Sequence, residues 1–210
     1  MRLSILFAIL ISSCLSLAQN KETVKVKLES EFSDGLSGNL MRFQKLEYYC
    51  ITIKSKKIKN LDFYLIAKNY DERGLTRTDT ILNTHFFERT YFGNNSSEGK
   101  IFSFSIVTQN NKSDSVHFGF YFPRTNENKI FNKLPRDDYS FRDAILSNGK
   151  YLSLAKDSLY PILVYSLPYE DPKRPGYLFY CELTSQGFPP SQWGQKYGVK
   201  HCIVYELMVR

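Results

Sequence analysis

The residues best suited to contact a ligand lie in one polar loop near the end of the chain. This loop, Ser185 to Lys200, carries the only tryptophan, Trp193, together with Tyr197, Gln192 and Gln195. Flat aromatic faces and amide groups are what a sugar ring or a protein partner contacts. Long loops on a rigid sheet are common positions for such groups. We therefore predict ligand binding at these four residues. The alternative, which we favour for Trp193 itself, is that its ring folds back and plugs the end of the domain.

The histidines show no pattern that is typical of catalysis or of metal binding. The chain has three, His85, His117 and His201, and they lie far apart in the sequence. None has the spacing that places two ligands on one face of a helix or strand. His201 and Cys202 are adjacent, but neighbouring residues of a strand point to opposite faces and cannot form a nucleophile–base pair. We predict no catalytic residue, no cofactor and no metal ligand. A metal site assembled from residues that are distant in the sequence is the alternative.

Carboxylates offer a weaker route to enzymatic chemistry. Glu182 and Glu206 lie on the polar faces of the last two strand-like runs, and a pair of carboxylates is what a glycan or cell-wall hydrolase requires. Solvent-facing strand residues explain the same pattern more simply. The chain also lacks a Gly-x-Ser-x-Gly turn, a phosphate-binding glycine loop and a His-Glu-x-x-His pair. We therefore favour a non-enzymatic protein over an enzyme.

One segment is strongly basic. Lys54 to Asn60 contains four lysines, and the formal net charge of the chain is +7. Such a segment could contact an anion or a nucleic acid. We favour a solvated turn between two strands, because no arginine or aromatic residue is interleaved with these lysines. No nucleic-acid partner is predicted.

The first residues have the features of a secretory signal peptide. Arg2 precedes an apolar segment that is too short to span a membrane, and Ala18 supplies a small residue before a cut. We predict cleavage between Ala18 and Gln19 and a secreted or periplasmic protein. The alternative is a membrane-anchored lipoprotein, since Ile11-Ser12-Ser13-Cys14 is similar to the bacterial lipidation motif.

Cleavage there leaves three cysteines, Cys50, Cys181 and Cys202. Export makes a disulfide feasible, and an odd count leaves one thiol unpaired. Cys181–Cys202 and Cys50–Cys181 are the candidate bridges. Strand alternation places Cys181 and Cys202 on different faces, which weakens the first pairing. The absence of any disulfide is a third alternative.

Period-two alternation dominates the remaining chain. Its clearest hairpin is Ile101–Phe122, in which Phe102, Phe104, Phe118 and Phe120 lie on apolar faces. Further strands are predicted at 24–28, 46–53, 61–70, 85–92, 160–167, 177–183 and 202–209.

Turns and breaks separate these strands. A loop with two turn signals is predicted at 34–38. Asp137–Ser147 is the one plausible helix, because Asp137 could cap its start and Asn148-Gly149 could end it. Pro161 indicates a strand at a sheet edge.

This pattern predicts an all-β fold for a single domain, residues 19–210, after a signal peptide at 1–18. The architecture is an antiparallel β-sandwich of about nine strands with at most one short helix, and a β-barrel is the alternative. The function predicted is an exported, non-enzymatic domain that binds a protein or glycan partner through a loop end or a sheet face. A glycan or cell-wall hydrolase and an inhibitor or immunity-type protein are the alternatives. The oligomeric state does not follow from the sequence.

The predicted signal peptide gives the first testable prediction. Mass spectrometry of the exported protein should give an N-terminus at Gln19, because the apolar segment ends at Ala18. A diacylglyceryl group on an N-terminal Cys14 would instead identify a lipoprotein.

Overall fold

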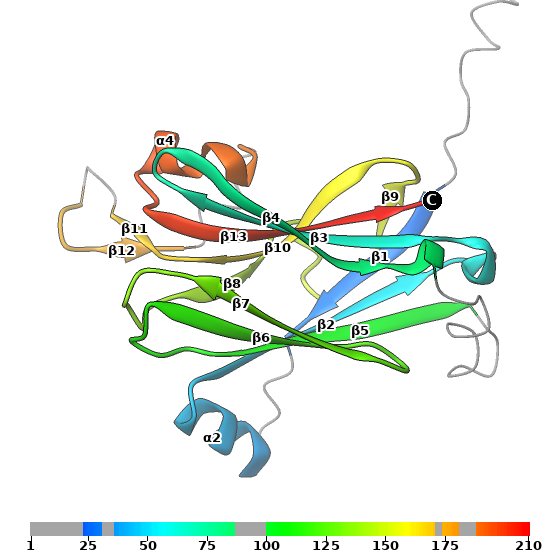
Figure 1. Ribbon diagram of the computed structural model, residues 1–210, viewed down its shortest axis with the longest axis horizontal. Coiled ribbons are helices and arrows are strands. Elements are labelled where there is room, and N and C mark those ends of the chain that lie inside the picture. Colours follow the sequence, from blue (N-terminus) through cyan, green and yellow to red (C-terminus); the bar gives the residue numbers. More distant parts are fainter. Residues whose placement is uncertain (1–22, 31–35, 87–99, 171–173, 181–187) are drawn as a thin grey trace, which may run out of the picture.

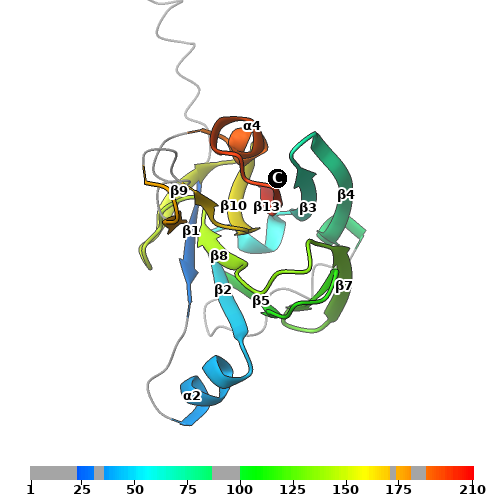
Figure 2. The same cartoon turned by 90° about the vertical axis from the view of Figure 1, so that its left-hand side faces the viewer.

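Two large antiparallel β-sheets stacked face to face form the body of the protein. The computed structural model describes residues 23–30, 36–86, 100–170, 174–180 and 188–210. The sheets lie one above the other in Figure 1, and the view along the strands in Figure 2 shows the two layers. The described strands form two large sheets and one small two-stranded sheet, and none of these closes into a barrel. The predicted antiparallel sandwich is therefore confirmed.

The first sheet, here called sheet A, has six strands in the order β7-β6-β5-β2-β1-β9. Its strands are β1 (Thr23–Glu29), β2 (Leu46–Lys54), β5 (Ile101–Gln109), β6 (Ser115–Tyr121), β7 (Asn126–Asn132) and β9 (Leu152–Ala155). The hairpin predicted at 101–122 is β5 and β6, which pair directly through residues such as Ile106 and Phe120.

The second sheet, sheet B, has five strands in the order β4-β3-β13-β10-β8. Its strands are β3 (Phe63–Asp71), β4 (Gly74–Asn83), β8 (Ser140–Asp143), β10 (Leu159–Ser166) and β13 (His201–Val209). The last strand, β13, pairs with β3 on one side and β10 on the other, so the C-terminal run lies at the centre of this sheet. Two short strands, β11 (Tyr169–Glu170) and β12 (Leu178–Phe179), pair only with each other.

Aromatic rings fill the space between the sheets. The Phe118 ring from sheet A makes an edge contact with Tyr165 at 5.2 Å and with Tyr205 at 5.6 Å, both from sheet B. Phe63 and Phe102 stack across the same space at 4.8 Å. These rings are almost fully buried. Edge-to-face and offset contacts of this kind add about 0.5–1.5 kcal/mol each beyond area burial.

A second, smaller cluster lies on the outer face of sheet B. It joins Val164 of β10 and Cys202 and Val204 of β13 to Trp193 and Val199 of the preceding segment. Since strand residues alternate between faces, these side chains point away from the main core. Part of the outer face of sheet B is thus covered by the protein's own chain.

The helix predicted at Asp137–Ser147 is wrong. Residues 140–143 form strand β8, which pairs with β10, and Phe141 is buried in the main core. The Asp143 carboxylate accepts hydrogen bonds from the backbone N–H groups of Ile145 and Ser147, so it caps a turn rather than a helix. Pairing with β10 outweighs the weak helix signals of this short segment.

The structure also differs from the predicted loops and strands at several other segments. The loop expected at 34–38 contains the start of helix α2 (Leu36–Phe43), which projects from the sandwich in Figure 1. Strands β4, β7 and β9 were not predicted, because their alternation is interrupted by polar residues on exposed edges. For the strand predicted at 85–92, Thr84–Phe86 forms a short 3-10 turn, η2, and residues 87–92 lie outside the described part of the chain.

The prediction that Pro161 marks a strand at the edge of a sheet was also wrong. Strand β10 lies inside sheet B, between β13 and β8. Pro161 is tolerated there because the β8 ladder begins only at Leu163, and the pairing with β13 is irregular between these two residues. The run predicted at 177–183 is described only to Tyr180, and its strand part is β12.

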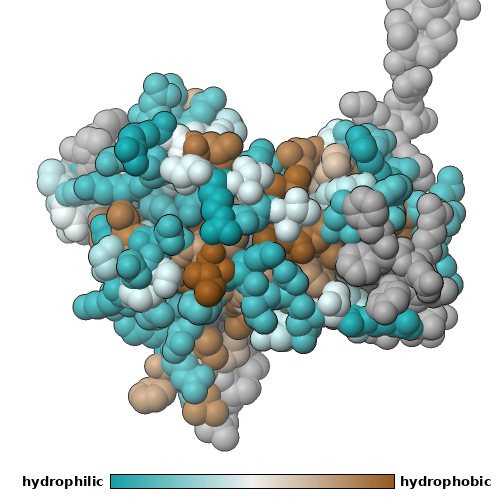
Figure 3. All heavy atoms as spheres, in the orientation of Figure 1, coloured by the Kyte–Doolittle hydropathy of each residue, from teal (hydrophilic) through white to brown (hydrophobic). Residues whose placement is uncertain are grey.

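The surface is mostly polar on the side seen in Figure 3, with apolar residues along the seam between the sheets and on α2. Leu40 and Phe43 of α2 are 50% and 86% exposed. Within the described ranges, no helix has the length and apolar character needed to cross a membrane.

The core generates a stability prediction. Phe120 is fully buried and contacts the Tyr205 ring at 5.8 Å, so replacing it with alanine should lower the free energy of unfolding by about 3–5 kcal/mol. Denaturant unfolding would measure this loss. The matched control is His117→Ala on the exposed face of the same strand, where we expect a change within about 0.5 kcal/mol. Equal stability of the two variants would mean that the wrong face of β6 has been placed in the core.

Candidate functional site

From Phe188 onward, the loop that the sequence singled out folds onto the outer face of sheet B, and residues 185–187 lie outside the described part of the chain. Pro190–Gln192 forms a 3-10 turn, η4, and Trp193–Tyr197 forms the short helix α4. Gly198 ends this helix with a φ of 69°, a left-handed conformation that glycine adopts without strain. The whole segment therefore closes as a compact cap near one end of the sandwich (Figure 1).

Within this cap, the four predicted binding residues do not share one surface. The Trp193 ring is 1% exposed, and its Nε1–H donates to the Phe188 carbonyl oxygen at 3.1 Å. Tyr197 is half-buried against Tyr169 at 5.5 Å, while Gln192 and Gln195 are exposed. Trp193 thus occupies the plug position that we favoured as the alternative. Ligand binding by these four residues stays a prediction.

The histidines have separate structural surroundings. His85 Nδ1 lies 3.0 Å from the Asp62 carboxylate near the surface, and His117 is exposed. His201 is buried, its Nδ1 lies 2.9 Å from the Tyr139 hydroxyl, and burial lowers its pKa to about 4. Among the described residues, no group of histidine, cysteine, aspartate and glutamate could hold a metal ion.

Of the carboxylate pair singled out from the sequence, the structure describes only Glu206. Glu206 forms an ion pair with Lys68 at 2.6 Å, and Glu182 lies outside the described residues. A half-buried carboxylate that the sequence did not reveal is Glu47, which accepts a hydrogen bond from the Phe141 N–H at 2.6 Å. Burial raises the pKa of Glu47, and its role is to join β2 to β8 across the sandwich.

The expected disulfides are not formed. Cys50 and Cys202 are both free thiols, and each candidate bridge needed one of them. Cys202 lies beneath Trp193 in the second cluster, and burial raises the pKa of its thiol to about 12. Cys181 lies outside the described residues. A thiol with so high a pKa reacts slowly, which fits a structural residue.

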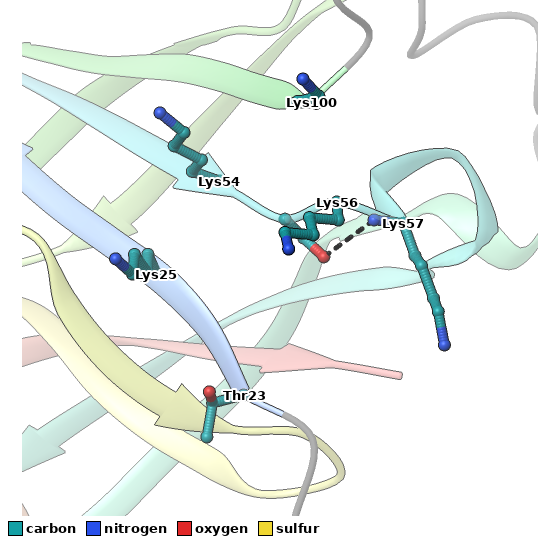
Figure 4. Close-up of a pocket in the computed structure, with 7 residues that line it drawn as sticks. Thr23, Lys25, Lys54, Lys56, Lys57 and Lys100 are labelled. Carbon is teal, nitrogen blue, oxygen red and sulfur yellow. Dashed lines mark hydrogen bonds between the residues drawn. The ribbon is translucent and has the colours of Figure 1, made fainter.

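A pocket of about 380 Å³ lies at the ends of three strands of sheet A (Figure 4). We call it the lysine pocket and define it by its seven lining residues. They are Thr23, Lys25, Lys54, Ser55, Lys56, Lys57 and Lys100. Five of the seven are lysines, and none is acidic.

Strand pairing brings these lysines together. Lys25 of β1 lies directly opposite Lys54 of β2 in the antiparallel ladder. The Ser55 N–H donates to the Lys100 carbonyl oxygen at 3.0 Å, which fixes the start of β5 beside the end of β2. The next turn is tightened by the Ser55 hydroxyl, which accepts a hydrogen bond from the Lys57 N–H at 3.2 Å.

Five lysine side chains place positive charge around this pocket. All five are exposed. Within the described ranges, Lys25, Lys54 and Lys56 have no acidic partner. The Lys57 side chain extends away from the other four in Figure 4. Lys25, Lys54, Lys56 and Lys100 therefore form the cationic part of the pocket.

Sequence reasoning located only part of this site. It singled out the run from Lys54 to Lys59 but favoured a solvated turn. Lys25 and Lys100 are distant in sequence, and only the ladder places them beside Lys54. The alternation of β1, which puts Lys25 on the polar face, was the one available signal.

A second pocket, of about 350 Å³, holds the carboxylates of Glu29 and Asp143 with the Tyr49 side chain. Asp143 already accepts hydrogen bonds from the Ser147 hydroxyl and from three backbone N–H groups. Glu29 forms an ion pair with Lys27 at 2.7 Å. Both carboxylates are thus engaged in local structure, and this pocket offers less unpaired charge than the lysine pocket.

Comparisons with known proteins give no relative. No protein-family model matches the chain, and neither a curated protein nor a solved structure is similar to it. The candidate site is therefore argued from the chain's own geometry.

Trp193 generates a prediction that separates the plug from a binding platform. Because its ring is buried in the second cluster, Trp193→Ala should lower the free energy of unfolding by about 3–5 kcal/mol. Gln195→Ala, on the exposed side of the same helix, should leave the thermal midpoint nearly unchanged. A stable Trp193→Ala protein that no longer captures a partner would show instead that this ring binds the ligand.

Proposed function

We propose that the protein is an exported, non-enzymatic β-sandwich that binds an anionic glycan in the lysine pocket. The observation that carries this proposal is the gathering of Lys25, Lys54, Lys56 and Lys100 around one pocket whose lining holds no acid. This pocket lies apart from the four residues predicted from the sequence to bind a ligand, none of which lines it.

Electrostatics favours an anionic ligand there. Ammonium groups held close together repel one another, and a bound anion replaces this repulsion by attraction. Each lysine is exposed, so a single ion pair would contribute only up to about 1 kcal/mol. Useful affinity therefore requires several lysines to act on one ligand, which is what their common position allows.

The size and lining of the pocket favour a glycan over a protein surface. A volume of about 380 Å³ lies within the range of small-molecule sites and suits a group of sugar size. Thr23 and Ser55 supply hydroxyl groups beside the lysines. Hydroxyls donate to and accept from sugar hydroxyls equally well.

The same lining argues against hydrolysis at this site. A glycosidase needs two carboxylic groups on either side of the scissile bond, and the pocket lining contains none. The signal peptide predicted at 1–18 would place the domain where extracellular or periplasmic glycans occur. A lipid anchor at Cys14 would leave the binding role unchanged.

The proposal predicts a charge effect at one position. Lys54→Glu should lower the affinity for polygalacturonate, an anionic glycan, by about tenfold, because it reverses the charge between Lys25 and Lys100. Titration calorimetry in low-salt buffer would measure this, and raised salt should weaken binding of the wild type. Neutral dextran should not bind measurably.

The matched control is Lys200→Glu, an equal charge change at an exposed residue next to α4, and we expect wild-type affinity for it. If Lys54→Glu and Lys200→Glu bind polygalacturonate equally well, or if the wild type binds none, the lysine pocket is not the binding site.

A further inference from the structure

A lane of small polar side chains runs along the outer face of sheet A, away from the lysine pocket. Thr52 and Cys50 of β2 lie opposite Ser103 and Ser105 of β5, respectively. These pairs follow directly after Lys54, which lies opposite Ile101. Alternate residues of a strand share a face, so the lane and Lys54 lie on the same side of the sheet.

The lane has the length of more than one sugar unit. From Lys54 to Cys50 is four residues along β2, which corresponds to about 13 Å of extended strand. Cys50, Ser103 and Ser105 are half-buried and Thr52 is 9% exposed, so the short side chains form a shallow floor between larger neighbours. The Ser103 hydroxyl donates to the Thr52 hydroxyl at 3.2 Å, and both oxygens retain acceptor capacity.

Larger side chains stand on both sides of the lane. On the β1 side, Lys27 lies opposite Thr52, and its ammonium is 5.3 Å from the centre of the Tyr151 ring. On the β6 side, Tyr121 lies opposite Ser105 and is 47% exposed. A Cβ atom at Gly119 would come within 2.9 Å of the Tyr121 ring, so this ring leans over the glycine and lies along the sheet.

The lysines themselves indicate a chain-like ligand rather than one small anion. They come from three separate segments, β1, the end of β2 with its turn, and the residue before β5. The pocket of about 380 Å³ has room for a group larger than one phosphate or carboxylate, such as a charged sugar unit. A lysine ammonium is a point charge and lacks the paired donors of arginine. These residues therefore recognise the amount of negative charge on a ligand rather than the shape of one anionic group.

Among anionic polymers, the surroundings favour a glycan over a nucleic acid. The seven residues of the lysine pocket include no arginine and no aromatic ring on which a base could stack. The lane instead offers hydroxyl groups and, at its far end, the exposed Tyr121 ring, both of which suit sugar units.

We infer that the ligand is an extended anionic glycan, with one charged unit in the lysine pocket and the following units along the lane over Thr52, Ser103 and Ser105 toward Tyr121. This inference rests on the proposed function of the lysine pocket. It adds the polymeric nature of the ligand and the direction in which it leaves the pocket.

The test compares ligand lengths with a variant that fills the lane. Ser103→Tyr puts a bulky, uncharged side chain at a position where a strand accommodates it readily. Titration with galacturonic acid hexamer should show an affinity about fivefold lower than wild type, because the lane contacts are lost. Weak binding of inorganic phosphate and of galacturonic acid monomer, measured by competition, should be unchanged.

Two controls accompany this variant. Thr78→Tyr makes the same kind of change at an exposed position of β4 in sheet B and should bind the hexamer as wild type does. Ser105→Tyr is a second lane variant, for use if Ser103→Tyr lowers the thermal midpoint.

The outcomes separate the two proposals. If the lane variants bind the hexamer normally while Lys54→Glu does not, the lane inference is wrong and the lysine pocket stands. If Lys54→Glu also binds normally, the proposed function fails. Tighter binding of a single-stranded DNA heptanucleotide than of the hexamer, at equal ligand charge, would overturn the choice of a glycan.

Discussion

Packing of aromatic rings between the sheets is the interaction on which the rest of the structure depends. Phe118 contacts rings from three strands of sheet B, among them Phe141, Tyr165 and Tyr205. Because a strand alternates its side chains, burying one set of residues forces the other set outward. A slip by one residue in any of these strands would expose several rings, so the core also holds each strand in one register.

That register determines the outer faces. With Val24 and Val26 buried, Lys25 must point outward, and with Ile51 and Ile53 buried, Thr52 and Lys54 must do the same. The antiparallel ladder then sets Lys25 beside Lys54. The cationic pocket is thus a consequence of the core packing rather than of any direct attraction among its residues.

The outer faces of sheet A and sheet B differ in how far other parts of the chain cover them. Trp193 and its segment cover part of the outer face of sheet B with a second apolar cluster, which turns Val164, Cys202 and Val204 into buried residues. The outer face of sheet A bears lysines, short hydroxyl side chains and an exposed tyrosine instead. A sandwich can have one face sealed by its own chain and the other open to solvent, and the open face is where a ligand gains access.

The sequence alone decided some features of the fold, and only the tertiary structure decided the others. Strict alternation of large apolar residues at 101–122 was sufficient to predict the β5–β6 hairpin, its buried phenylalanines and the sandwich class, because period two allows only one amphipathic solution. Weak local signals failed at Asp137–Ser147, where pairing with β10 outweighed them. The loop from Ser185 to Lys200 was singled out from the sequence, but the inward turn of Trp193 depended on apolar partners in β10 and β13. The grouping of Lys25, Lys54 and Lys100 also required the fold, since long-range strand pairing brings together residues whose separation along the chain carries no such information.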